Sequence, residues 1–170
     1  MKDLEKTFLD SYNTHSDQIF RFIFFKLNDR EKAKDFTQEV FMKTWVYISK
    51  NGAVENDKAF LYKIANNLVI DEYRKKGRAS VRSLDELMED GQDFGENPGE
   101  SWIDKMDGEG ALVLIKNLPE TYSEILFMRY VEELGVSEIA AITGKSVNVI
   151  SVRINRGIKR LKEIIKSKKQ

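Results

Sequence analysis

The chain has 170 residues, of which 41% are hydrophobic and 33% are charged, a composition typical of a folded protein with one modest core or two small ones. It contains no cysteine and one histidine. Disulfides and thiolate metal sites are therefore excluded, and a histidine-based zinc site has too few ligands. We expect no metal and no cofactor.

The N-terminal segment, residues 1–17, mixes acidic, basic and apolar side chains and lacks the apolar core of a signal peptide. No later stretch approaches the roughly 20 apolar residues that a membrane-spanning helix needs. We therefore expect a cytoplasmic protein without membrane insertion.

The formal net charge of zero hides an uneven distribution. Residues 1–78 carry 15 basic and 12 acidic side chains, residues 79–110 carry 2 and 10, and residues 111–170 carry 11 and 6. From Lys145 onward there are nine basic side chains and one acidic side chain, Glu163. This local excess suits a polyanion such as a phosphate backbone.

The first part of the chain has the spacing of a helical domain. Apolar residues recur at helical intervals over residues 4–76. The breaks fall at residues 28–30 and 51–57, where Asn, Asp and Gly favour helix caps and loops. The pattern predicts a domain of three or four helices over residues 1–78.

The segment 79–110 differs from both neighbours. It holds five glycines, Pro98 and the acidic excess, which predicts a flexible acidic linker. Helical spacing resumes at Leu112 and predicts a second helical domain over residues 111–170. The fold class that we expect is all-α, with two small helical domains joined by the linker.

Within the second domain, residues 137–142, 143–145 and 146–162 have the pattern of a helix, a tight turn and a helix. Gly144 supplies the backbone freedom that the turn requires, and Ser137 and Ser146 are good N-cap residues. The segment is therefore a candidate helix-turn-helix.

The second helix of this motif is amphipathic. A helical wheel predicts that its core face consists of Val147, Ile150, Ile154, Ile158 and Leu161. In a helix-turn-helix the opposite face enters the major groove, where Asn can pair with adenine and Arg with guanine. The candidate base readers are Asn148, Ser151, Val152, Asn155 and Arg156. Lys159 also lies on the polar face, and Arg153, at its flank, is a candidate for a phosphate contact. The alternative is a basic helix whose polar face is only solvated.

Three segments resemble a known family. Residues 118–130 (LPETYSEILFMRY) followed by SEIAAITG resemble region 4 of sigma factors. Residues 35–45 (DFTQEVFMKTW) resemble the region 2.2 helix of the extracytoplasmic-function sigma family, and residues 59–76 resemble its regions 2.3 and 2.4. Region 4 alone is shared in part with response regulators, whereas the region 2.2 match is specific.

The resemblance implies a set of partners and contacts. The region 2.2 helix is expected to bind the clamp coiled coil of the largest subunit of core RNA polymerase, around an apolar centre. Of the apolar residues Phe36, Val40 and Phe41, either all pack inward or one faces the partner. The expected polar contacts are Asp35, Gln38, Glu39 and Lys43. The polymerase flap and an anti-sigma factor are further implied partners.

The resemblance also implies promoter DNA as a ligand. A loop at residues 52–58 is expected to hold a flipped-out base of the −10 element, and the second domain is expected to read the −35 element as duplex. Capture of a single strand needs a basic groove and hydrogen-bonding side chains. The expected −10 contacts are Lys63, Asn66, Asn67, Arg74, Lys75 and Lys76.

The acidic and basic residues show no constellation of nucleophile, base and oxyanion donor, so we do not expect an enzyme. We expect a sigma factor that docks on core polymerase and directs promoter-specific initiation. The alternative is a stand-alone helix-turn-helix regulator whose first domain senses a ligand or dimerises, in which case dimers bind duplex palindromes without polymerase.

Overall fold

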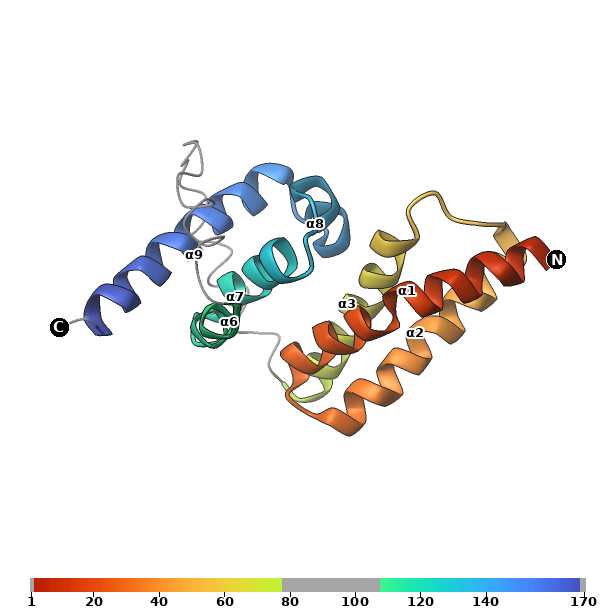
Figure 1. Ribbon diagram of the computed structural model, residues 1–170, viewed down its shortest axis with the longest axis horizontal. Coiled ribbons are helices and arrows are strands. Elements are labelled where there is room, and N and C mark those ends of the chain that lie inside the picture. The colour runs from red at the N-terminus through yellow and green to blue at the C-terminus, as the bar shows by residue number, and fades with distance from the viewer. Residues whose placement is uncertain (1, 78–107, 169–170) are drawn as a thin grey trace. The chain divides into compact units, whose positions relative to one another are not determined.

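The computed structural model describes residues 2–77 and 108–168, and every regular element in those two ranges is a helix. The chain divides into two compact units, Met1–Arg78 and Ala79–Gln170 (Figure 1). The predicted linker at residues 79–110 lies, up to residue 107, outside the described residues. No helix among the described residues combines the length and hydropathy needed to cross a bilayer.

The N-terminal unit consists of α1 (Lys2–Leu27), α2 (Arg30–Asn51) and α3 (Asp57–Lys75). α1 and α2 run antiparallel, and α3 contacts both (Figure 1). The breaks lie where the sequence predicts them, because local side chains cap the new helices. The Asp29 carboxylate accepts the Lys32 N–H at 3.1 Å, and the Asn56 amide oxygen accepts the Ala59 N–H at 3.0 Å.

The core of the N-terminal unit lies where its three helices meet. Its most buried large side chains are Ile19, Phe22, Ile23, Leu61 and Tyr62. The rings of Phe22 and Tyr62 meet edge to face at 5.3 Å, a favourable aromatic geometry. The three helices therefore share one hydrophobic core, which fixes the faces that α2 and α3 leave exposed.

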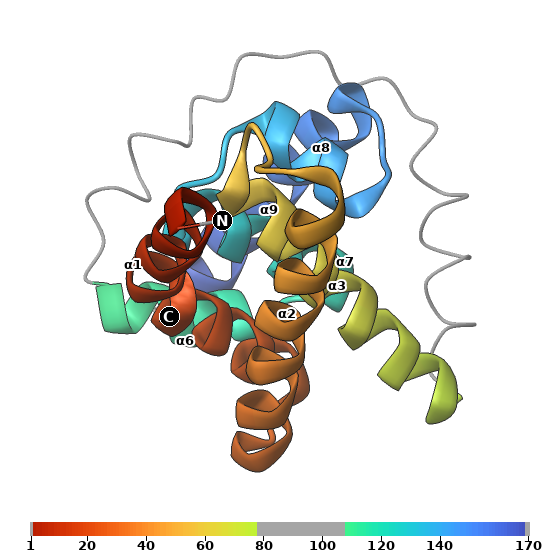
Figure 2. The ribbon, with the colours of Figure 1, turned by 90° about the vertical axis from the view of Figure 1, so that its right-hand side faces the viewer.

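The C-terminal unit consists of α6 (Gly108–Lys116), α7 (Glu120–Leu126), a π-helical segment η2 (Phe127–Val131), α8 (Val136–Thr143) and α9 (Val147–Lys168). α6, α7 and α8 all contact α9, the longest helix described in this unit (Figure 2). Gly157 permits the close crossing of α7 and α9, since a Cβ there would lie 3.0 Å from the Leu126 Cδ1 atom.

α8 and α9 form the predicted helix-turn-helix. Gly144 ends α8 in the left-handed region, with φ of 73°, and the Ser146 hydroxyl caps α9 by accepting the Val149 N–H at 3.1 Å. The prediction of Ser137 as the first cap is wrong. α8 begins at Val136 because the Glu138 carboxylate accepts the Gly135 N–H at 3.1 Å, which makes Gly135 the N-cap.

Candidate functional site

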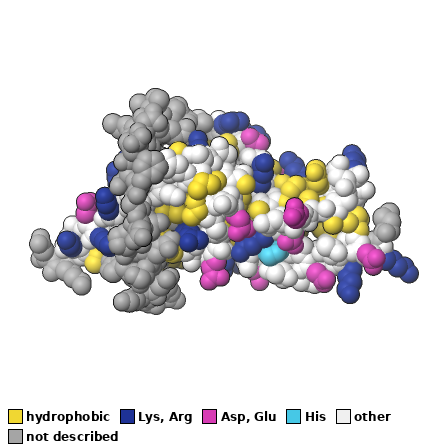
Figure 3. Space-filling view, turned by 90° about the horizontal axis from the view of Figure 1, so that it is seen from above, with side chains coloured by type: hydrophobic (Ala, Val, Ile, Leu, Met, Phe, Trp, Pro, Cys, Tyr) yellow, Lys and Arg dark blue, Asp and Glu magenta, His cyan; other side chains and the backbone are white. Residues whose placement is uncertain are grey.

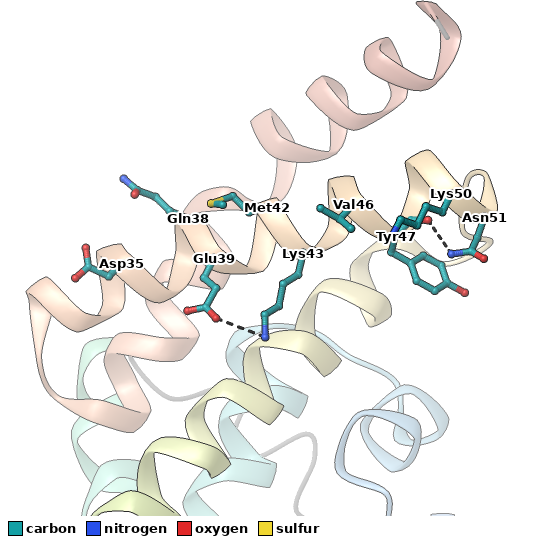
Figure 4. Close-up of a pocket in the computed structure, with 9 residues that line it drawn as sticks. All are labelled: Asp35, Gln38, Glu39, Met42, Lys43, Val46, Tyr47, Lys50 and Asn51. Atoms are coloured by element: carbon teal, nitrogen blue, oxygen red, sulfur yellow. Dashed lines mark hydrogen bonds and ion pairs between the residues drawn. The ribbon is translucent and has the colours of Figure 1, made fainter.

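The four polar residues predicted to contact polymerase lie together on one face of α2. Figure 4 shows Asp35, Gln38, Glu39 and Lys43 along a single side of the helix, where they line a hollow of about 790 Å³. Glu39 and Lys43 form an ion pair at 3.5 Å, with side chains 44% and 55% exposed. Such an exposed pair contributes little to folding stability, so both groups can make contacts elsewhere.

The apolar residues expected around the centre of this face take the inward one of their two predicted arrangements. Val40 and Phe41 are buried, and Phe36 is half-buried. The exposed apolar residues are Met42, Val46 and Tyr47, at 68%, 53% and 44% exposure. Gln38, Met42 and Val46 recur at intervals of four, which places them in one row along the helix. This spacing is a sequence signal that could have identified Met42 and Val46 as part of the same face as Gln38. We call Met42, Val46, Tyr47 and the four polar residues the α2 face.

A second hollow, of about 410 Å³, adjoins the α2 face on its α1 side. It shares Gln38 and Met42 with the first hollow, and its other walls are aromatic: Phe8, Tyr12, Phe41 and Trp45. The N-terminal unit also carries hydrophobic side chains among charged ones on the face seen in Figure 3. The aromatic rings pack against one another, with centroids 5.2 Å apart for Phe8 and Trp45.

The residues predicted to bind the −10 element divide into exposed and buried groups. Lys63, Asn67, Arg74, Lys75 and Lys76 are exposed on α3 or at its end. The first three fall in one row of the helix, at spacings of four and seven. Asn66, by contrast, is 1% exposed and lies in the core between the helices. The structure contradicts a DNA contact by Asn66, since it lies on the side of α3 that the other two helices cover.

The loop before α3, residues 52–56, is fixed at both ends. Gly52 has a φ of 87°, which ends α2, and its N–H donates to the Ile48 carbonyl at 2.8 Å. At the other end, the His15 Nε2 atom of α1 lies 3.6 Å from the Asp57 carboxylate. The base-holding loop is predicted over residues 52–58, but its last two residues belong to α3. These contacts join its two ends to α2 and α1.

The candidate −35 residues lie on α9. Asn148 and Lys159 are exposed, and Ser151, Asn155 and Arg156 are half-buried. Val152 and Arg153 are only 3% and 6% exposed, which contradicts the predicted base and phosphate contacts. Three helices contact α9, so they cover a wider part of its surface than the apolar residues of the helical wheel indicate. The structure also corrects Val147, predicted to face the core, which is 50% exposed.

Comparison with known proteins agrees with this two-unit arrangement. Residues 11–79 match the family model described as sigma-70 region 2, and residues 111–161 match that of sigma-70 region 4. The chain is 25% identical over 170 residues to the ECF RNA polymerase sigma factor SigW of Bacillus subtilis, covering 94% of this chain and 89% of SigW. It is 30% identical over 145 residues to the RNA polymerase sigma factor SigV of the same organism, covering 85% of this chain and 82% of SigV.

A similar fold is found in a solved structure. The sigma factor RpoE, crystallised in complex with the anti-sigma factor NepR from Bartonella quintana, superposes with a TM-score of 0.66 at 22% identity. The superposition covers 98% of each chain.

Proposed function

Because the chain belongs to the sigma-70 family, as an RNA polymerase sigma factor of the extracytoplasmic-function class, we propose that its two units dock on core polymerase and read two elements of one promoter. The N-terminal unit contacts the polymerase clamp and captures the −10 element, and the C-terminal unit reads the −35 element. The observation that carries the proposal is the α2 face, whose exposed apolar centre and charged rim occur in the same chain as a capped helix-turn-helix.

The α2 face has the make-up of a protein interface. Interfaces combine an apolar centre with a polar rim, and complementary charges on the rim set orientation and partner choice. Met42 and Val46 provide the centre, while Asp35 and Glu39 place acidic groups, and Lys43 a basic group, around it. We assign this face to the clamp coiled coil, and Gln38 to a hydrogen bond at its rim.

The exposed row of α3 suits a separated DNA strand. The Lys63 and Arg74 side chains supply positive charge for the backbone, and the Asn67 amide can hydrogen-bond an unpaired base. Lys75 and Lys76 extend the positive surface at the end of α3. Binding energy from these contacts opens the duplex, so the protein needs no catalytic activity of its own.

The exposed side of α9 suits duplex DNA. Asn148 and Asn155 can each make two hydrogen bonds to an adenine edge in the major groove, and Arg156 can do so with guanine. Ser151 lies between them, and Lys159 is placed for a phosphate. We assign these five residues to the −35 element.

An anti-sigma factor is a further partner that we propose. The related sigma factor RpoE was crystallised with the anti-sigma factor NepR. In this chain, a protein that covers the α2 face competes with polymerase for the same apolar residues, Met42 and Val46. We place the protein in the cytoplasm, where polymerase and promoters are found.

The stand-alone regulator is not supported. It explains the helix-turn-helix but gives no role to the match of residues 11–79 to sigma region 2.

The test is run-off transcription by core RNA polymerase on a library of randomised promoters, with and without the protein. We expect start sites that depend on the protein and share two elements at a fixed spacing. Absence of such sites with several competent core enzymes, together with tight duplex binding by the protein alone, contradicts the proposal and favours the regulator.

A further inference from the structure

Val147 is the one large aliphatic side chain of α9 that the described structure leaves strongly exposed. It is 50% exposed, whereas Ile150 and Ile154 are completely buried and Leu161 is 1% exposed. An exposed valine on a surface helix needs no special explanation by itself. Val147, however, is the first residue of the helix that we assign to the major groove, and the first turn of such a helix contacts base edges.

The position of Val147 is fixed by the cap of the helix. The Ser146 hydroxyl accepts the Val149 N–H at 3.1 Å, and the Ser146 carbonyl accepts the Ile150 N–H at 3.1 Å. The valine side chain is β-branched and has few accessible rotamers. Its methyl groups are therefore held in place before any ligand binds, which lowers the entropic cost of a contact.

Val147 continues a row of candidate base readers. Val147, Ser151 and Asn155 follow one another at intervals of four residues, so they lie along one side of α9. Each step advances about 6 Å along the helix, close to two base-pair steps of about 3.4 Å. The row thus presents an apolar group, a hydroxyl and an amide in order.

The surroundings favour DNA as the occupant. From Lys145 to the end of the chain there are nine basic residues and one acidic residue, and Lys145 itself lies beside the turn. The competing ligand is an acidic protein. Such a partner gives no defined role to the adjacent Asn148 amide, whereas DNA does. In the major groove the apolar group that a valine can recognise is the C5 methyl of thymine.

We propose that Val147 is a specificity-determining residue that reads the methyl group of one thymine in the −35 element. The inference rests on the proposed function and adds a base preference to it. The contact distinguishes thymine from cytosine at the same position, because cytosine lacks the methyl group and presents an amino donor instead.

The experiment measures holoenzyme binding to the promoter found in the transcription screen, with each −35 thymine replaced in turn by deoxyuridine. This replacement removes only the methyl group. At one position we expect about fourfold weaker binding by the wild-type holoenzyme, the effect of withdrawing one methyl-sized group from an apolar contact. Val147→Ala is expected to weaken binding to the thymine promoter by a similar factor and to abolish the deoxyuridine effect at that position.

Val113→Ala is the matched control, because Val113 is 60% exposed and lies on α6 in the same unit. It should keep the full deoxyuridine effect. Equal deoxyuridine effects in the wild type and Val147→Ala at every thymine, or a −35 element without thymine, overturn the assignment of Val147. Promoter-specific initiation by the same holoenzyme leaves the proposed function standing in that case, whereas absence of specific initiation refutes both.

Discussion

Glu72 is a buried carboxylate held between two lysines of the N-terminal unit. Its side chain is 11% exposed, accepts a hydrogen bond from Lys32 of α2 and lies 3.7 Å from the Lys76 Nζ atom. The Lys32 ammonium lowers the pKa of Glu72 below its ordinary value of 4.5. The same hydrogen bond raises the pKa of Lys32 above 10.5. The contact joins α2 to the end of α3.

These pKa directions predict how stability depends on pH. The unfolded chain binds a proton at Glu72 more readily than the folded chain, so stability falls as the pH drops from about 4.5 through the lower folded pKa. For Lys32 the folded pKa is the higher one, so stability is present below 10.5 and is lost as the pH rises through the folded pKa. Unfolding midpoints measured between pH 3 and pH 11 test both the acid and the alkaline flank of the stability profile. This range includes the ordinary pKa values of a carboxylate and of a lysine.

Glu72→Gln should remove this contribution at both flanks and lower stability near neutral pH by about 1 kcal/mol. Glu31→Gln is the control, because Glu31 makes an exposed ion pair with Lys34 at 3.7 Å. That variant should leave the pH profile of the wild type almost unchanged. A Glu72→Gln profile with the same acid flank as the wild type would show that other carboxylates determine that flank.

At the scale of elements, the crossing of α7 and α9 depends on Gly157. A Cβ at this position would lie 3.0 Å from the Leu126 Cδ1 atom and 3.3 Å from the Tyr122 Cβ atom. Gly157→Ala gains helix propensity, about 1 kcal/mol, but overpacks a core at a cost of about 1–3 kcal/mol. We expect a net loss of about 1 kcal/mol in chemical denaturation.

Gly110→Ala is the matched comparison within the same unit. Gly110 also lies in a helix, α6, but a Cβ there meets nothing within 4 Å. This variant should gain up to about 1 kcal/mol from helix propensity alone. If Gly157→Ala and Gly110→Ala change stability in the same direction, close packing is not the reason that position 157 is a glycine.

The α2 face gives a second prediction at this scale. The double variant Met42→Ala and Val46→Ala removes most of the exposed apolar centre without touching the core. We expect affinity for core polymerase, measured by fluorescence anisotropy, to fall roughly ten- to hundredfold, since central apolar residues of interfaces contribute most to binding. Unfolding stability should stay within about 0.5 kcal/mol of the wild type.

Lys34→Ala on the same helix is the control for this variant. Lys34 is 51% exposed and does not line either hollow of the N-terminal unit. Its substitution should leave polymerase affinity within about twofold of the wild type, because exposed charges and exposed ion pairs contribute little. Unchanged affinity of the Met42 and Val46 variant would place the polymerase contact elsewhere.

Local sequence features predict the elements better than they predict the exposed faces. The caps at Asp29, Asn56 and Ser146 and the turn at Gly144 depend on neighbours within three residues, so the sequence reveals them directly. Exposure depends on which helices cover a given side. The burial of Asn66 and Arg153 could therefore not be predicted from one helix alone.

The π-helical segment η2 shows the same limit. Nothing in the residues Phe127–Val131 distinguishes them from ordinary helix formers. The segment is followed by a turn in which Glu133 has a φ of 57°. The Arg129 guanidinium, within the segment, donates a hydrogen bond to the Leu134 carbonyl of this turn at 3.1 Å. Because π-helical turns are rare, the presence of helix-forming residues alone does not predict one.

At the scale of the whole molecule, charge is divided along the chain although its sum is zero. Residues 79–110 carry ten acidic and two basic side chains, whereas the segments on either side have positive balances. Negative charge on the same chain reduces the average attraction of the protein to any polyanion. The acidic segment should therefore weaken binding to DNA of random sequence, whatever its conformation.

Replacing the ten Asp and Glu residues of this segment with Asn and Gln tests that expectation on the full-length protein. We expect roughly tenfold tighter binding to a scrambled duplex at low salt, measured by fluorescence anisotropy over a series of KCl concentrations. The difference should vanish near 1 M salt, where the screening length falls to about 3 Å. Uncharged replacements of Ser80, Ser83 and Gln92 in the same segment should change nothing. A gain in affinity that persists at high salt would mean that the acidic residues act through a specific contact and not through their summed charge.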